Sequence, residues 1–229
     1  MNARRLPQRV ENGNGAMNIE NVLRVNEKLT AVYEKDAISF GGVAVWLSTG
    51  KPRAPATGPY ERRTDMDFFV PAMTKEYSLR LKEQELNIAD SLDRHCYVYY
   101  RASASEKIPI DLVSFEISFF GVPYGVIENN TVRLSLGEDG SLREGSGKPG
   151  ELTVASVPIL GILKTRALER KRPSDAEDLA RLLDFHYGGS ASRFIDENDM
   201  IIRMAFKDSQ RDASALKYSL ENFDKARRK

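Results

Sequence analysis

The stretch Thr64-Asp65-Met66-Asp67-Phe68-Phe69-Val70 joins two carboxylates to a run of large apolar residues. It predicts a β-strand. Because side chains alternate across a strand, Asp65 and Asp67 should share one face, while Met66 and the apolar residues in phase with it fill the other. Two like charges that close together repel, which favours a divalent cation, alone or chelated with phosphate oxygens, between them. The alternative is a strand that begins at a solvated edge, where both aspartates face water.

The composition is that of an ordinary globular protein. The chain has 229 residues, of which 41% are apolar, enough to bury a substantial core. Its net charge of +1 creates no global field that favours nucleic acid or membrane. Cys96 is the single cysteine, which excludes an internal disulfide and a cysteine-built metal site. The longest apolar run, Ile38 to Leu47, is about half of a membrane span, and no signal peptide is evident, so we expect a cytoplasmic protein.

The sequence divides into three parts. Residues 1–17 are basic and polar and predict a flexible arm, residues 18–155 an α/β core, and residues 156–229 a helical region that closes the cleft. Within the core, the periodicity predicts helices over 18–33 and 74–93, strands over 37–40, 96–100, 108–113, 131–135 and 152–155, and a flexible connection over 137–150. Helices are also expected near 174–187, 196–207 and 209–227. The fold class is therefore α/β (α+β), a small mixed sheet flanked by helices.

Two glycines stand where a predicted strand meets a short buried helix. Gly41 and Gly42 let the backbone approach a ligand closely, and the N–H groups of the helix start can bind a phosphate. The alternative is a tight turn that simply needs glycine. The segment from Lys51 to Arg63 follows, with three prolines and four basic residues, and it predicts a loop that delivers positive charge next to Asp65.

These residues resemble a known family. The segments Phe40-Gly41-Gly42-Val43-Ala44 and Arg62-Arg63-Thr64-Asp65-Met66-Asp67 look like the core of the polymerase-β-type nucleotidyltransferases, and most of all the small stand-alone enzymes of the AbiEii toxin group. The likeness covers roughly residues 35–185. It implies that Asp65 and Asp67 bind Mg²⁺ or Mn²⁺ and that a third carboxylate from a neighbouring strand completes the metal site. Asp111 is the candidate, because an isolated acid in the apolar run 108–113 is costly unless something compensates it.

Lys164 lies within the apolar stripe of the helix that follows Ser156. A lysine there can simply snorkel to solvent, but the resemblance favours contact with the phosphates of a nucleoside triphosphate, alongside Gly41, Gly42 and Arg63. Asp175 and Asp178 follow a basic segment, and we interpret both as structural, stabilising a helix start or pairing with Arg170.

The resemblance implies a Mg²⁺-dependent nucleotidyltransferase that moves an NMP from an NTP to a hydroxyl group. The leading acceptor is RNA, such as a tRNA end, and the protein would then act as the toxin of a pair with an antitoxin protein. A hydroxyl on a partner protein is the first alternative, as in AMPylation. A nucleotide-binding module without turnover is the second. The insertion at 51–63 departs from the family pattern and leaves the acceptor open.

Overall fold

The structure is a computed structural model that describes residues 7, 18–51, 65–92, 95–104, 106–114, 118–137, 139–148, 151–207 and 209–228. The predicted arm, apart from Pro7, and the loop from Lys51 to Arg63, apart from Lys51, lie outside these residues. The described chain divides into two compact units. The sheet unit falls within residues 6–116 and 131–154, and the helical unit within 117–130 and 155–229.

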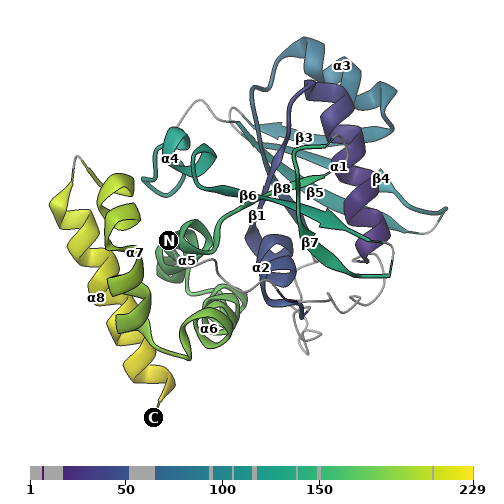
Figure 1. Cartoon of the computed structure of the whole chain (residues 1–229). Helices are drawn as coiled ribbons and strands as arrows, with labels where there is room; N and C mark the ends of the chain where they lie inside the picture. Colours follow the sequence, from purple (N-terminus) through teal and green to yellow (C-terminus); the bar gives the residue numbers. More distant parts are fainter. Residues whose placement is uncertain are drawn as a thin grey trace. The chain divides into compact units, whose positions relative to one another are not determined.

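The sheet has eight strands among the described residues, in the order β3-β4-β5-β2-β1-β8-β6-β7 (Figure 1). Their bounds are β1 (Ile38–Phe40), β2 (Met66–Val70), β3 (Leu86–Leu92), β4 (His95–Arg101), β5 (Lys107–Ser114), β6 (Thr131–Leu136), β7 (Leu142–Glu144) and β8 (Leu152–Ala155). β2 runs parallel to β5 and antiparallel to β1, while β1 runs parallel to β8. The sheet is therefore mixed, and the predicted α/β fold class is confirmed.

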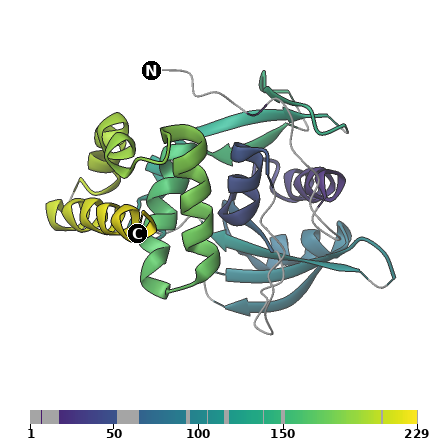
Figure 2. The same cartoon turned by 90° about the horizontal axis from the view of Figure 1, so that it is seen from below.

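One face of the central strands is almost fully buried. Its side chains are Met66, Phe68 and Val70 of β2, Ile108, Ile110 and Leu112 of β5, and Cys96, Val98 and Tyr100 of β4. Helix α1 (Ile19–Tyr33) lies over part of this face (Figures 1 and 2). The Nζ atom of Lys28 on this helix lies 5.3 Å from the ring centroid of Tyr100. Asn18 caps α1 by accepting a hydrogen bond from the backbone N–H of Asn21 at 2.8 Å.

The opposite face of these strands is buried at one end and open at the other. Phe40 of β1 stacks on Phe69 of β2 with ring centroids 3.9 Å apart, and both rings are buried. Toward the start of β2 the same face carries Asp67, which is half-buried. The sequence alternation expected for the Asp65–Val70 stretch therefore separates a buried apolar face from a face that reaches solvent.

The structure corrects several predicted elements. The predicted helix over 74–93 is wrong beyond Glu83, where α3 (Lys75–Glu83) ends. Glu85 turns the chain with a φ of 60°, and Leu86 begins strand β3, which pairs with β4. Leu86 and Ile88 suit a helix or a strand equally well by spacing, and the cross-strand partners on β4 decide between the two.

Three further elements differ from the prediction. The predicted flexible connection over 137–150 contains β7, and the carboxylate of Glu151 accepts backbone hydrogen bonds from Ser146 and Gly147 at 2.7 and 2.6 Å. Helix α7 begins at Ala191 instead of near 196, because Ser190 caps it by accepting from Arg193 N. The sequence analysis did not anticipate the short helix α4 (Tyr124–Glu128).

The helical unit contains α4 and the helices α5 (Val157–Ala167), α6 (Pro173–Tyr187), α7 (Ala191–Ala205) and α8 (Gln210–Arg227), with a single 3₁₀ turn, η1 (Leu168–Arg170). Gly161 of α5 lies against the ring of Phe194 of α7, where an added Cβ atom would overlap the ring. A glycine is thus required for the close approach of these two helices. No helix in the described part of the chain is both long and apolar enough to cross a membrane.

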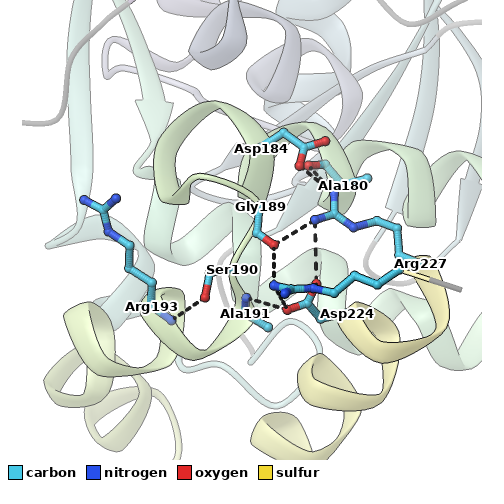
Figure 3. Close-up of polar contacts among 9 residues, drawn as sticks. Ala180, Asp184, Gly189, Ser190, Ala191, Arg193, Asp224 and Arg227 are labelled. Atoms are coloured by element: carbon cyan, nitrogen blue, oxygen red, sulfur yellow. Dashed lines mark hydrogen bonds and ion pairs between the residues drawn. The ribbon is translucent and has the colours of Figure 1, made fainter.

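The end of α8 is fastened to the turn between α6 and α7 (Figure 3). Arg227 donates to Asp184 Oδ1 at 2.7 Å and to the carbonyl of Gly189 at 2.9 Å. Asp224 accepts from the backbone N–H of Ala191 at 3.2 Å and also pairs with Arg228. These contacts satisfy the carbonyl of the turn and one N–H group at the start of α7, so α8 is held by its last turn.

We predict that Arg227→Ala lowers the free energy of unfolding by about 1–3 kcal/mol, because it removes charge-assisted hydrogen bonds from a partly buried side chain. Urea denaturation followed by circular dichroism measures this change. Arg203→Ala is the matched control, since its ion pair with Asp199 is exposed to solvent and should contribute little to stability. Equal losses in both variants would contradict a special role for Arg227.

Candidate functional site

The sheet places two of the predicted carboxylates side by side. β2 and β5 pair in parallel with Asp67 opposite Asp111, and strands in a sheet lie about 4.8 Å apart. Directly opposed residues share a face, and both aspartates are half-buried. Asp65, also half-buried, directly precedes β2 and lies two residues before Asp67. The structure thus brings Asp67 and Asp111 together on one sheet face, and, within the described residues, it does not bring Asp65 into a three-carboxylate metal site with them.

The start of helix α2 (Gly41–Thr49) lies beside the same carboxylates. β1 pairs with β2 so that Phe40 is opposite Asp67, and α2 begins at the next residue. Gly41 has a φ of +70°, and a Cβ atom added there would overlap the carboxylate of Asp67. Only glycine fits this position, because the backbone both adopts a left-handed conformation and meets another side chain.

The first turn of α2 is not capped by the side chain of its own N-cap residue. Phe40 is its N-cap, and no side-chain hydrogen bond caps the helix there. Helix starts carry a partial positive charge and bind anions. A ligand that contained both a phosphate and a cation would therefore find complementary groups within one site, N–H groups from α2 and carboxylates from β2 and β5.

The donor set fits Mg²⁺ or Mn²⁺ delivered with a phosphate. Carboxylate oxygens are the ligands these hard cations prefer. Within the described residues, no group of three or more histidine, cysteine, aspartate or glutamate side chains is arranged to hold a metal ion. Mg²⁺ ordinarily binds through one or two carboxylates together with waters and substrate phosphates, and Asp67 and Asp111 supply two carboxylates.

The other predicted site residues are placed differently. Arg63 lies outside the described residues. Lys164 belongs to the helical unit and is 8% exposed. Its Nζ lies 2.8 Å from Asp175 Oδ1 and 2.8 Å from Asp178 Oδ2, so the lysine forms a buried ion cluster between α5 and α6. Arg181 adds a longer contact of 3.5 Å to Asp178.

The sequence predicts structural roles for Asp175 and Asp178, but it does not identify Lys164 as their partner. Arg170, the partner that it suggests, lies instead over the ring of Phe120 at 4.4 Å from the centroid. A signal was present in the sequence, because residues three apart share a helix face and a lysine within an apolar stripe needs a counter-charge when buried. Contact of Lys164 with a nucleotide phosphate stays a prediction, and any test of it must account for the cluster.

The ion cluster has a defined dependence on pH. Burial by itself lowers the pKa of Lys164, but the charges of Asp178 and Asp175 outweigh it and raise that pKa above its ordinary value of 10.5. The folded-state pKa thus exceeds the unfolded value. The contribution that the raised pKa of Lys164 makes to stability is fully present below pH 10.5 and is lost as the pH rises through the folded-state pKa.

We predict that Lys164→Met lowers the free energy of unfolding by about 3–5 kcal/mol, because it removes the buried cation 2.8 Å from both Asp175 and Asp178 and leaves Asp178 its longer contact with Arg181. Adding Asp175→Asn and Asp178→Asn to this variant should recover much of the loss, since the two buried negative charges that Lys164 compensated are then removed. Chemical denaturation at pH 8 measures both. Lys217→Met serves as the control, because its pair with Asp199 is more exposed. A fully stable Lys164→Met protein would show that the cluster contributes little.

We predict that Gly41→Ala disturbs the site directly, by forcing a left-handed backbone on alanine and displacing the Asp67 carboxylate. The melting temperature should fall by several degrees, corresponding to at least about 1–2 kcal/mol. Gly125→Ala is the matched control, because a Cβ atom there meets no atom within 4 Å and alanine favours helix α4. Unchanged melting of the Gly41→Ala protein would argue against the close approach.

Comparison with known proteins does not assign this chain to a family. No protein-family model and no curated protein matches it. Among solved structures, it is similar to the crystal structure of JHP933 from Helicobacter pylori, with 15% sequence identity, a TM-score of 0.46, and coverage of 94% of this chain and 93% of that chain. A likeness at this level carries no functional inference, and the function must be argued from the residues of the site.

Proposed function

We propose that the protein is a metal-dependent nucleotidyltransferase that moves an NMP from an NTP to a hydroxyl group of RNA. The observation that supports this most is the placement of Asp67 opposite Asp111 beside the glycine-built start of α2. Carboxylates for a cation and N–H groups for phosphates are the two requirements for binding a metal–triphosphate chelate. Both occur here within one unit, on rigid elements of the sheet.

Each part of the site has a role in this proposal. Asp67 and Asp111, with Asp65 next to them, would hold Mg²⁺ or Mn²⁺, which neutralises developing charge on the phosphates when it is bound. The N–H groups of Gly41 and Gly42 would donate hydrogen bonds to the triphosphate, a contact that needs no charged side chain. Arg63 and Lys164 are the proposed cationic contacts, and the ammonium group of Lys164 would then be shared between a phosphate and the carboxylates of Asp175 and Asp178.

The chemistry is an in-line displacement at phosphorus. The oxygen of the acceptor hydroxyl forms a bond to the α-phosphorus, the bond from that phosphorus to the bridging oxygen of the β-phosphate breaks, and pyrophosphate leaves. We assign the proton of the hydroxyl to the carboxylate of Asp111, which is half-buried and therefore reachable from solvent. Asp67, held against Gly41, is fixed in position and is the better candidate for a purely electrostatic role.

The direct experiment is incubation of the protein with each α-labelled NTP, Mg²⁺ and total RNA or cell lysate, followed by separation of RNA from protein. Label in RNA supports the proposed acceptor. Label in a protein band would favour the alternative acceptor, a hydroxyl on a partner protein. No label in any macromolecule with any NTP would leave a nucleotide-binding module without turnover, and calorimetry with Mg²⁺ and NTP would then measure that binding.

We predict that Asp67→Asn and Asp111→Asn each reduce nucleotide transfer by at least about 100-fold while leaving the fold intact. Stability without metal should stay equal or rise slightly, because each change removes one of two neighbouring like charges. The label-transfer assay and thermal denaturation measure the two effects.

Asp196→Asn is the control, since this aspartate is exposed on α7 and should affect neither property. Wild-type transfer by the Asp111→Asn protein would remove Asp111 from the site. Loss of stability with unchanged activity would show that the carboxylates are structural.

A further inference from the structure

The face of the sheet that carries Asp67 and Asp111 continues onto β4 and the start of β5. Here the strands pair Tyr97 with Asp111, Tyr99 with Pro109, and Arg101 with Lys107. Opposed residues of antiparallel strands share a face, and every second residue along a strand shares it too. The residues Tyr97, Tyr99, Arg101, Lys107 and Pro109 therefore form one continuous surface that ends at Asp111, which we call the tyrosine strip.

The tyrosine strip reaches solvent, whereas the reverse face of the same strands is buried. Tyr97 is 40% exposed, Tyr99 and Pro109 are half-buried, and Lys107 and Arg101 are exposed. On the reverse face, Cys96 and Val98 are 1% and 2% exposed. Two successive tyrosines on an open sheet face differ from the single apolar side chains that scatter over most protein surfaces.

Charge changes sign along the tyrosine strip. Its inner end is acidic, at Asp111 and Asp67, and its outer end is basic, at Lys107 and Arg101. The Nζ atom of Lys107 lies 4.7 Å from the ring centroid of Tyr99, within the range of a cation–π contact. This contact holds the Lys107 ammonium group next to an aromatic ring. A base stacked on such a ring would bring its phosphate close to that cation.

We propose that the tyrosine strip binds the end of a single-stranded RNA, with bases stacked on Tyr97 and Tyr99 and backbone phosphates near Lys107 and Arg101. Its terminal hydroxyl would then lie at Asp111. This occupant rests on the proposed function, in which Asp111 takes the proton of the acceptor hydroxyl. Unpaired bases present flat faces that stack on aromatic rings, and phosphates pair with cations, so one strand satisfies both features of the surface.

The length and polarity of the tyrosine strip suit this occupant. Four residue steps separate Asp111 from Lys107, which at about 3.3 Å per residue gives roughly 13 Å. That is enough for roughly four stacked nucleotides at about 3.4 Å each. An RNA end presents a neutral hydroxyl to the acidic end of the strip, whereas an acidic peptide long enough to reach both ends would bring carboxylates against Asp111.

The test measures binding of a fluorescein-labelled ten-nucleotide oligoadenylate by anisotropy, without NTP or Mg²⁺, so that no transfer can occur. Tyr97→Leu and Tyr99→Leu should each weaken binding about 5-fold or more, because stacking on an aromatic ring is lost while an apolar side chain remains. Tyr218→Leu is the matched control, since Tyr218 is 68% exposed on α8 and should leave affinity unchanged.

The charge contribution is tested separately. Lys107→Gln should flatten the dependence of log affinity on log salt concentration by about 0.7, the value for one lost phosphate contact with single-stranded nucleic acid. Lys82→Gln, an exposed lysine on α3, should leave the slope unchanged. Because a leucine variant can fail to fold, a second measurement uses the wild-type protein. Bound oligonucleotide should protect Tyr97 and Tyr99 from chemical nitration.

The outcomes separate this inference from the proposed function. Wild-type protein that does not bind the oligonucleotide, or tyrosine variants that bind it as well as wild type, would overturn the tyrosine strip as an RNA platform. Binding that depends on both tyrosines in a protein that transfers no nucleotide would keep the strip and overturn the transferase. Transfer to RNA that is unaffected by either tyrosine change would keep the transferase and overturn the strip.

Discussion

The parallel pairing of β2 with β5 is the constraint on which the rest of the sheet unit depends. Its register is set by burial, because Met66 and Phe68 on one strand and Ile110 and Leu112 on the other fill the same covered face. A slip of one residue would turn these side chains toward solvent and carry Asp67 into the core. The hydrophobic effect therefore holds the two carboxylates together although their charges repel.

This arrangement separates what stabilises the fold from what the site needs. Burial of the apolar face along β2, β4 and β5 stabilises the folded state, while one end of the other face carries polar side chains that reach solvent. Gly41 serves both the fold and the site. Its left-handed backbone conformation lets the chain pass from β1 into α2, and its missing Cβ leaves room for the carboxylate of Asp67. A binding site of this kind stands on rigid strands and a helix start, which keeps the positions of its groups well defined.

Electrostatics follows a different logic in the helical unit. There Lys164 is surrounded by Asp175 and Asp178, so that a buried cation and its counter-charges compensate one another. The cluster ties α5 to α6, and Arg227 in turn ties the end of α8 to the turn after α6. Lys164 and Arg227 thus link helices in this unit, whereas in the sheet unit the like charges of Asp67 and Asp111 are brought together by the packing beneath them.

The sequence by itself determined the α/β class, the strand that carries Asp67, and the interruption of an apolar run by Asp111, because alternation and apolar spacing are local properties of the chain. It could not determine that Leu86 starts a strand, since spacing alone fits both a helix and a strand there and the partner strand decides. Nor could it identify the partners of Lys164, or the row formed by Tyr97 and Asp111. Those depend on which segments pair and in what register, a choice made by the burial of side chains distant in sequence, and only the tertiary structure records it.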